Sequence, residues 1–223
     1  MTPAIAGAKR PGMRKMQRWA GPLAAVALGA LASLALGWFR PLPVRAVSPG
    51  LVAQVVRDGT ATAIGPTDAD VTLIVFSDYQ CGPCRRSHPA MMRAVDKDKR
   101  VRVVTRELPI FGPRSIAAAR VALATGEQGL YGPVHDALMR EPRPLSEAVL
   151  RDVVTGQGGD WDRLQRDLVR LGPALDAKLA TNAARAHALA IPGTPAYVAG
   201  RWLSVGMLDE RGFRRFIAKA RAG

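Results

Sequence analysis

The sequence contains few of the residues that build disulfide-rich or aromatic-rich proteins. Only two of its 223 residues are cysteine, and only 5% are aromatic. Two cysteines are too few for a disulfide-stapled scaffold, which needs four or more, and too few for a zinc site made of four thiolates. If the cysteines carry a function, they therefore carry it as one pair.

Acidic residues are absent from the first 40 positions, which hold six Lys and Arg. The net charge is +14, and positions 41–223 keep +8 of it, from 26 basic and 18 acidic residues. Because 48% of the chain is hydrophobic and only 22% charged, extensive disorder is excluded, and one domain with an appendage or two small domains fit the length. No nucleic-acid-binding motif accompanies the positive charge, so we expect no nucleic-acid partner.

A run of uncharged residues, 19–39, follows a basic segment, 1–18. As a helix, the run is long enough to span a bilayer, and the positive charges before it predict a cytoplasmic N-terminus. We expect an uncleaved anchor in the inner membrane, with the remaining chain in the periplasm. The alternative is a cleaved signal peptide and a free periplasmic protein, because small-x-small sites end at Ala32 and Ala46. Both alternatives place the cysteines in an oxidising compartment.

The exported part begins with residues 40–59, whose three prolines predict a linker that ends in a short helical turn at 51–57. Residues 71–76 are a continuous apolar run rich in β-branched side chains, which is typical of a central strand. Residues 101–107 predict a second strand. Since a helical stretch separates the two strands, we expect them to pair in parallel.

The middle of the chain has a helical pattern, interrupted by Gly, Pro and Asp. It predicts five helical segments, at 116–124, 134–139, 145–154, 161–171 and 173–189. A β-hairpin of strands 196–199 and 202–205 follows, with Gly200 opening its tight turn, and a last amphipathic helix covers 209–220. This order of elements predicts an α/β fold.

The two cysteines lie in the segment Cys81-Gly82-Pro83-Cys84, between the first predicted strand and the next helix. Their spacing brings both thiols to one side of the first helical turn, where they can form a disulfide. At the helix N-terminus, Cys81 faces unpaired backbone N–H groups that stabilise its thiolate, whereas Cys84 is expected to be more buried. We therefore predict a redox-active pair, with Cys81 as nucleophile and Cys84 as resolving cysteine.

A Cys-x-x-Cys pair can also belong to a zinc site or form a purely structural disulfide. A Cys-x-x-Cys segment can form half of a zinc site, but the remaining ligands would have to come from three scattered histidines, so we expect no metal. A purely structural disulfide would close a very short loop and would add little stability. Redox chemistry without a metal or an organic cofactor explains the spacing best.

The segment 76–89 (FSDYQCGPCRRSHP), the helical block and Gly193-Thr194-Pro195 together resemble the DsbA-like thiol-disulfide oxidoreductases of the thioredoxin superfamily. The resemblance covers about residues 60–221. It implies a thioredoxin fold with a helical domain inserted at about 112–190. It also implies that Pro195 is a cis-proline packed against the redox pair, and that the backbone of Thr194 contacts the substrate.

Two further side chains close to the cysteines are candidate site residues. Asp78 lies three residues before Cys81 and either accepts a proton during thiol exchange or caps the following helix. His88 lies four residues after Cys84, on the same face of the helix, and either tunes that thiol or simply packs.

The resemblance implies an enzyme that introduces disulfides into exported proteins and is re-oxidised by a quinone-coupled membrane protein. The sequence departs from typical DsbA-like oxidases at Gly82-Pro83, a dipeptide found in reducing thioredoxins, and Thr194 is shared with periplasmic disulfide isomerases. The alternative is therefore a reductase or isomerase kept reduced by a membrane electron donor. A third possibility is a non-catalytic, copper-binding thiol module.

Overall fold

A computed structural model of the chain describes residues 42–56 and 62–223, together with Gly29. The chain divides into two units, residues 1–41 and 42–223. The second unit contains the fold. The predicted basic segment 1–18 and the predicted anchor 19–39 lie outside the described residues, apart from Gly29. Among the helices that are described, none is both long and apolar enough to cross a membrane.

The described residues form a six-stranded sheet in the order β1-β6-β5-β3-β4-β2. Its strands are β1 (Val44–Ala46), β2 (Thr62–Ile64), β3 (Val71–Ser77), β4 (Val101–Glu107), β5 (Ala196–Ala199) and β6 (Trp202–Val205). β3 and β4 are parallel, as predicted, and all other neighbours are antiparallel. Because β3 is an inner strand, the loop that follows it leaves from the middle of the sheet.

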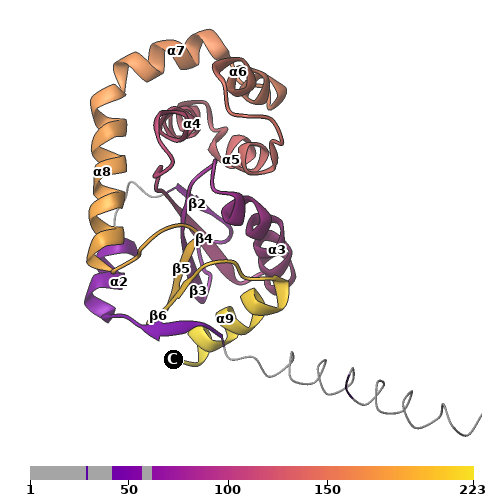
Figure 1. Cartoon of the computed structure of the whole chain (residues 1–223), viewed down its shortest axis with the longest axis vertical. Coiled ribbons are helices and arrows are strands. Elements are labelled where there is room, and N and C mark those ends of the chain that lie inside the picture. Colours follow the sequence, from indigo (N-terminus) through magenta and orange to yellow (C-terminus); the bar gives the residue numbers. More distant parts are fainter. Residues whose placement is uncertain (1–28, 30–41, 57–61) are drawn as a thin grey trace, which may run out of the picture. The chain divides into compact units, whose positions relative to one another are not determined.

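Helices cover both faces of the sheet (Figure 1). On one face, Leu73 and Val75 of β3 pack with α3 (Gly82–Asp98) and α9 (Glu210–Ala222). On the other face, Ile74 and Phe76 pack with α2 (Pro49–Val56) and with the end of α8 (Gly172–Ala188). Successive strand residues point to opposite faces, so the apolar run in β3 contributes to two cores at once.

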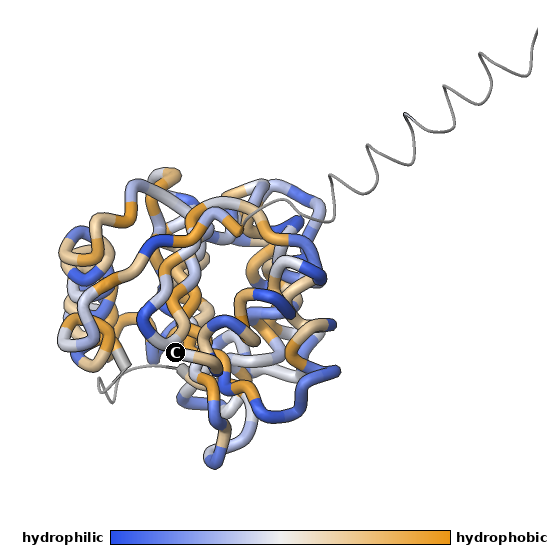
Figure 2. The backbone as a smooth tube through the Cα atoms, turned by 90° about the horizontal axis from the view of Figure 1, so that it is seen from below, coloured by the Kyte–Doolittle hydropathy of each residue, from blue (hydrophilic) through white to orange (hydrophobic). Residues whose placement is uncertain are grey.

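A helical block lies between β4 and β5 in the sequence. It contains α4 (Pro113–Ala124), a 3₁₀ turn (Thr125–Gln128), α5 (Tyr131–Arg140), α6 (Glu147–Gly156) and α7 (Trp161–Arg170), and α8 leads back to the sheet. The block has an apolar core of its own, to which Tyr79 from the loop after β3 also contributes. Figure 2 shows hydrophobic and hydrophilic stretches alternating along the backbone of the domain. The thioredoxin-like α/β fold with added helices is thus confirmed.

The predicted linker, residues 40–59, is corrected by the structure in part. Within this segment, Val44–Ala46 forms the edge strand β1, paired with β6, which was not predicted. Pro49–Val56 forms α2, in agreement with the helical turn predicted at 51–57. The Arg45 guanidinium donates hydrogen bonds to the carbonyl oxygens of Leu189 and Ala190, which join β1 to the end of α8. Proline is compatible with the edge of a sheet, and this explains why a proline-rich segment could be mistaken for a linker.

Candidate active site

The first helical turn of α3 holds both cysteines. Cys81 is the N-cap residue, with extended backbone angles (φ −72°, ψ 106°), and its Sγ atom accepts a hydrogen bond of 3.2 Å from the Cys84 backbone N–H. Pro83 occupies the first turn, where a missing N–H removes no helical hydrogen bond. Both cysteines are free thiols in this structure. The predicted placement of the pair at a helix N-terminus is therefore observed.

The loop before β5 lies directly against this pair. The peptide bond between Thr194 and Pro195 is cis. The Cys81 thiol donates a hydrogen bond of 3.3 Å to the Thr194 carbonyl oxygen. Pro195 lines a small cavity together with Cys84, and its carbonyl oxygen accepts a hydrogen bond of 2.8 Å from Gly206 N–H. The fold thus brings together four of the predicted site residues from opposite ends of the domain.

The environments of the two thiols differ electrostatically, although both residues are closed off from solvent. Cys81 is 1% exposed and Cys84 3%, so solvent exposure does not distinguish the two thiols. Hydrogen bonding with the Cys84 thiol and with Thr194 lowers the pKa of Cys81 to about 6, against the effect of burial. Hydrogen bonding to Cys81 and burial both raise the pKa of Cys84. Cys81 is therefore the thiolate and Cys84 the protonated partner at neutral pH.

Asp78 is buried and its carboxylate holds two loops together. It accepts hydrogen bonds from three backbone N–H groups and one hydroxyl, those of Gln80 (2.7 Å), Ile110 (2.7 Å), Phe111 (3.1 Å) and Ser115 (2.7 Å). The suggestion that its side chain caps α3 is wrong, because Cys81 fills that position. Asp78 instead fixes the start of α4 next to the loop that precedes the cysteines.

His88 faces the helical block from α3. Its Nε2 atom lies 2.8 Å from Oδ1 of Asp136 on α5, and its ring makes an edge contact with the ring of His135, at 5.4 Å between centroids. Burial and the neighbouring His135 lower the pKa of His88, so its imidazole is neutral at neutral pH. The predicted position of His88 on the face of Cys84 is observed, since both residues line one cavity.

Sequence reasoning missed a buried polar network behind the site. The Tyr79 and Tyr131 hydroxyls both donate hydrogen bonds of 2.7 Å to Oε1 of Glu107, and Nδ1 of His135 lies 2.7 Å from the Tyr79 hydroxyl. Burial and the negative charge of Glu107 raise the pKa of both tyrosines. In the sequence, the only indication of this network is Glu107 at the end of the strand β4. The partners of Glu107 come from other elements and could not be predicted.

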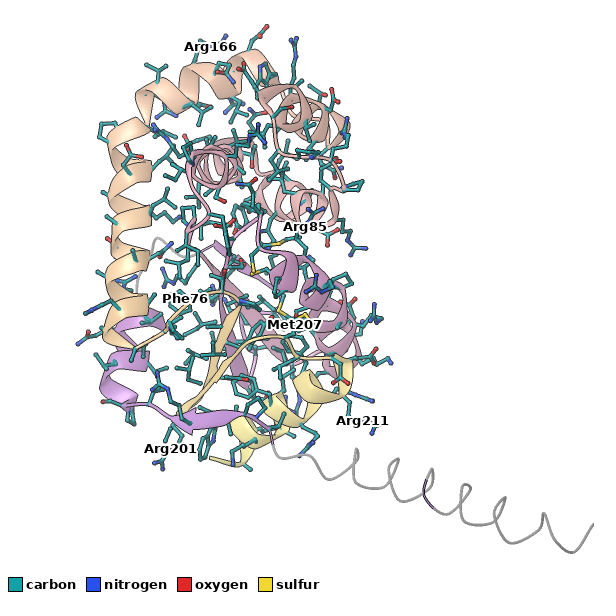
Figure 3. The ribbon with its side chains drawn as sticks, viewed as in Figure 1. Phe76, Arg85, Arg166, Arg201, Met207 and Arg211 are labelled. Atoms are coloured by element: carbon teal, nitrogen blue, oxygen red, sulfur yellow. The ribbon has the colours of Figure 1, made fainter. Side chains whose placement is uncertain are left out.

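Exposed apolar side chains lie on two loops that are hydrogen-bonded to residues close to the cysteines in the sequence. Ile110 and Phe111 lie in the loop fixed by Asp78, and Met207 lies in the loop after β6, where its sulfur accepts a hydrogen bond from Arg86 on α3 (Met207 is labelled in Figure 3). Phe111 and Met207 are each 52% exposed. This surface can contact an apolar segment of another protein next to the thiols.

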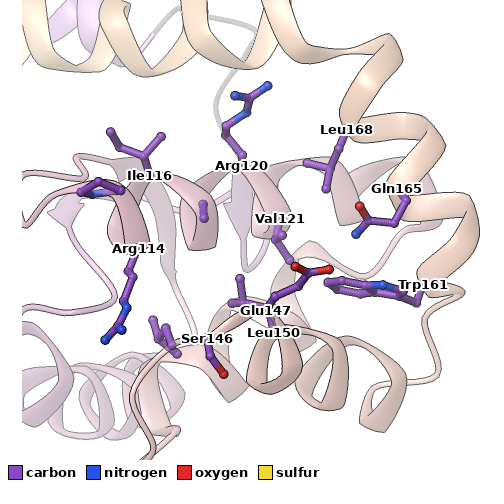
Figure 4. Close-up of a pocket in the computed structure, with 13 residues that line it drawn as sticks. Arg114, Ile116, Arg120, Val121, Ser146, Glu147, Leu150, Trp161, Gln165 and Leu168 are labelled. Carbon is purple, nitrogen blue, oxygen red and sulfur yellow. The ribbon is translucent and has the colours of Figure 1, made fainter.

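A cavity in the helical block does not contain the cysteines. It has a volume of about 680 Å³ and lies between α4, α6 and α7, with Ile116, Leu150, Trp161 and Leu168 among its lining residues (Figure 4). Within the described part of the chain, no group of three or more histidine, cysteine or carboxylate side chains is arranged to hold a metal ion. The thiol pair is therefore the centre of the candidate chemistry.

Paired thiols at a helix N-terminus exchange disulfides with other proteins through mixed-disulfide intermediates. On a thioredoxin-like fold, they define the class of thiol-disulfide oxidoreductases. The protein family that the chain matches agrees with the class of thiol-disulfide oxidoreductases. The family described as the DSBA-like thioredoxin domain matches residues 72–218, and the chain belongs to this family. The resemblance predicted from the sequence is confirmed.

Solved structures show the same likeness. A thioredoxin-like oxidoreductase from Silicibacter pomeroyi is 36% identical and superposes with a TM-score of 0.71, over 74% of this chain and 95% of that one. The thiol-disulfide exchange protein alpha-DsbA2 from Wolbachia pipientis has the same fold, with 23% identity, a TM-score of 0.71, and coverage of 77% of this chain and 94% of that one.

A curated relative is much longer than the matching segment. The Na(+)/H(+) antiporter NhaA 1 from Salinispora arenicola is 30% identical over 135 residues, which are 60% of this chain and 20% of the antiporter. The match thus spans only about a fifth of that relative.

Proposed function

We propose that this protein introduces disulfide bonds into exported proteins through its Cys81–Cys84 pair. A substrate thiolate attacks Sγ of Cys81, the Cys81–Cys84 bond breaks, and Cys84 leaves as a thiolate that takes up a proton. A second substrate thiolate then attacks the substrate sulfur of the mixed disulfide and releases Cys81 as a thiolate. The substrate is oxidised by two electrons, and the protein becomes a dithiol.

The observation that carries this proposal is the position of Cys81 at the N-terminus of α3, where its Sγ accepts the Cys84 N–H and its pKa is lowered to about 6. A stabilised thiolate favours the reduced form of the pair over its disulfide, so the disulfide is a stronger oxidant. The same thiolate is the better leaving group from the mixed disulfide, which favours transfer of the bond to the substrate. Cys84 is protonated at neutral pH and attacks a mixed disulfide on Cys81 only after it has lost its proton.

The neighbouring surface supports an extended protein substrate. Phe111 and Met207 offer exposed apolar contacts on loops that are hydrogen-bonded to the cysteine segment. The Thr194 carbonyl lies against Sγ of Cys81. A backbone carbonyl of this kind can pair with a substrate segment in the manner of an added strand. We assign Thr194 to substrate contact and Pro195 to packing against the redox pair, as the family resemblance implies.

The setting of the reaction is also part of the proposal. Residues 19–39 anchor the chain in the inner membrane with the catalytic domain in the periplasm, or direct its export if they are cleaved. A quinone-coupled membrane protein would re-oxidise the dithiol. We propose no cation transport for this chain, because the match to the antiporter is confined to a fifth of that protein.

The alternative function is disulfide reduction or isomerisation, by the same chemistry with a membrane electron donor. The observation that favours it is the Gly82-Pro83 dipeptide between the cysteines. Turnover of insulin disulfides and refolding of a scrambled substrate, each with an excess of small-molecule thiol, measure these activities directly. Rapid insulin reduction together with slow oxidation of reduced substrates would favour the alternative.

The redox state of Cys81 and Cys84 in living cells decides the direction. Acid quenching followed by alkylation with a mass-shifting thiol reagent reports it, and we expect the pair to be mostly oxidised. A mostly reduced pair would overturn the oxidase proposal. A copper module would instead show stoichiometric copper bound by the dithiol form and lost when both cysteines are replaced.

Cysteine variants test the two assigned roles. Cys84→Ser should accumulate mixed disulfides with exported proteins on Cys81, because the resolving thiol is gone, and Cys81→Ser should form none. Thiol-sensitive adducts on a non-reducing gel, identified by mass spectrometry, are the readout. Absence of adducts in Cys84→Ser would contradict the assignment.

A further inference from the structure

A small internal cavity lies beside Sγ of Cys84. Its volume is about 10 Å³, which is the smallest size that holds a single water molecule. Polar or titratable side chains from three elements, those of Ser77, Cys84, His88 and His135, line the cavity together with Val75, Met91, Met139, Pro195 and Tyr197. Ser77 is 2% exposed, and its hydroxyl has no hydrogen-bond partner among the described residues. A site with this size and these polar groups is suited to one bound water.

The resolving thiol needs a route for its proton. Cys84 must lose a proton before it can attack the mixed disulfide, and it must regain one when it leaves as a thiolate. Because Cys84 is 3% exposed, bulk water does not reach it directly. Burial and hydrogen bonding to Cys81 raise the pKa of Cys84, so its proton is not released spontaneously at neutral pH.

His88 connects the cavity with the surface. Its Nε2 atom is 2.8 Å from Oδ1 of Asp136, whose side chain is 40% exposed. Although partial burial opposes ionisation, hydrogen bonds with His88 and Arg140 lower the pKa of Asp136, so its carboxylate accepts the Nε2–H of His88. In the neutral imidazole, Nδ1 then carries the lone pair that can take up a proton.

We propose that His88 transfers protons between Cys84 and solvent, through a water molecule held in this cavity, with Asp136 positioning the imidazole. When the Cys81–Cys84 disulfide forms, the proton of Cys84 passes through the water to Nδ1 of His88, and Nε2 releases a proton at the exposed carboxylate. When the disulfide breaks, a proton returns to Cys84 by the reverse path. The inference rests on the proposed exchange at the two cysteines but not on its direction.

The other charged groups around His88 determine how it titrates. These groups are His135, Asp136 and Arg140 on α5, Cys84 on α3, Tyr197 on β5 and, behind His135, Glu107 on β4. His135 and Arg140 disfavour a positive charge on His88, whereas Asp136 favours it. Replacing Asp136 therefore makes the imidazole a weaker proton acceptor and frees its orientation.

The test separates the two half-reactions in one experiment. The reduced full-length chain is mixed with excess oxidised glutathione, quenched in acid at successive times and analysed by mass spectrometry. Appearance of the glutathione adduct on Cys81 reports the first step, and its conversion to the Cys81–Cys84 disulfide reports the resolving step. Both rates are measured across the pH range in the wild type, His88→Gln and Asp136→Asn, with Asp176→Asn as the control for loss of a surface carboxylate.

We expect His88→Gln and Asp136→Asn to slow the resolving step by more than about ten-fold near neutral pH, with adduct formation unchanged. Their resolving rates should approach the wild-type rate at high pH, where hydroxide removes the proton. Asp176→Asn should match the wild type. Because Asp136 is partly exposed, Asp136→Asn keeps the test valid even if His88→Gln fails to fold.

Wild-type resolving rates and an unchanged pH profile in Asp136→Asn would overturn the inference. Equal slowing of the resolving step at every pH, or slowing of both steps, would indicate a purely structural role and would also overturn it. Failure of the wild-type chain to form or resolve the adduct is a different result, and it would contradict the proposed function.

Discussion

The Sγ atom of Cys81 lies 3.3 Å from the carbonyl oxygen of Thr194, a residue 113 positions further along the chain. When Cys81 is protonated, its thiol donates this hydrogen bond, while its sulfur accepts another from the Cys84 N–H. A sulfur engaged in a disulfide has no proton to donate. Formation of a mixed disulfide on Cys81 thus leaves the Thr194 carbonyl able to accept a backbone N–H from the substrate.

The reactivity of Cys81 should depend on pH around its lowered pKa. The rate of its alkylation by iodoacetamide should rise with a midpoint near pH 6, because only the thiolate reacts and the pKa of Cys81 is about 6. Cys84 should remain unmodified over the same range, since its pKa is raised. Mass spectrometry of the alkylated peptides measures both rates. A midpoint close to that of an ordinary cysteine would contradict the site electrostatics.

The same shift predicts how the stability of the reduced protein changes with pH. Between the folded-state pKa of Cys81, about 6, and its ordinary value of 9.0, the unfolded chain holds the proton that the folded chain has released. Stability from this group is therefore complete above pH 9 and is lost as the pH falls through 6. The free energy of unfolding in urea should rise from pH 6 to pH 9 more in the reduced wild type than in Cys81→Ser. Equal slopes would exclude a stabilised thiolate.

Replacement of Asp78 separates its structural role from a catalytic one. Asp78→Asn should lower the free energy of unfolding by about 1–3 kcal/mol, because an amide cannot accept all the hydrogen bonds that the carboxylate accepts. The negative charge of Asp78 also raises the pKa of Cys81, against the larger lowering effect of its hydrogen bonding with Cys84. The alkylation midpoint of Cys81 should therefore fall in Asp78→Asn. Slower thiol exchange with an unchanged midpoint would instead favour Asp78 as a proton acceptor.

The buried network around Glu107 should contribute to stability. Tyr131→Phe removes one of the two hydroxyls that donate to Glu107, and we expect the free energy of unfolding to fall by about 1–3 kcal/mol. Tyr79→Phe and the double variant complete a mutant cycle. Because both tyrosines share one carboxyl oxygen, the two losses should not be additive. Additive losses in urea unfolding would show that the hydroxyls act independently.

The apolar side chains beside the thiols should affect protein substrates selectively. Phe111→Ser and Met207→Ser should each lower kcat/KM with an unfolded, reduced protein by about ten-fold, because each loses a large apolar contact. Exchange with glutathione should be unchanged, since a small thiol does not need this surface. Ile116→Ser, which changes an exposed apolar residue of the other cavity, is a suitable control. Equal loss with both substrates would contradict a substrate-contact role.

Much of the fold could be predicted where the pattern of residues is local. The apolar run of β3 and the pattern of β4 identified two parallel strands, and the hairpin of β5 and β6 was predicted with its observed bounds. Gly200, which has φ +54°, was recognised from the turn that it must make. Strands β1 and β2 were not predicted, because each has only three residues and is defined by its partner strand.

The part of the site that could be predicted is the part whose chemistry depends on the spacing of residues in the sequence. Cys81 and Cys84 were identified from their separation and their position at the start of a helix. Thr194 and Pro195 came from resemblance to a known family, because nothing in their local sequence places them near the cysteines. The hydrogen-bond partner of His88 lies on α5, and most of the partners of Asp78 lie on α4 and in the loop before it. The sequence around His88 and Asp78 does not indicate these partners.

The sequence by itself determined the redox pair, the central strands and the helical block, because each is encoded by residues that are neighbours in the chain. Only the tertiary structure decided which groups surround the pair. The contacts of Cys81 with Thr194, of His88 with Asp136 and of Glu107 with its two tyrosines join segments that are far apart in the sequence. Such contacts arise when the helical block and the sheet pack together, and they set the pKa values on which the chemistry depends.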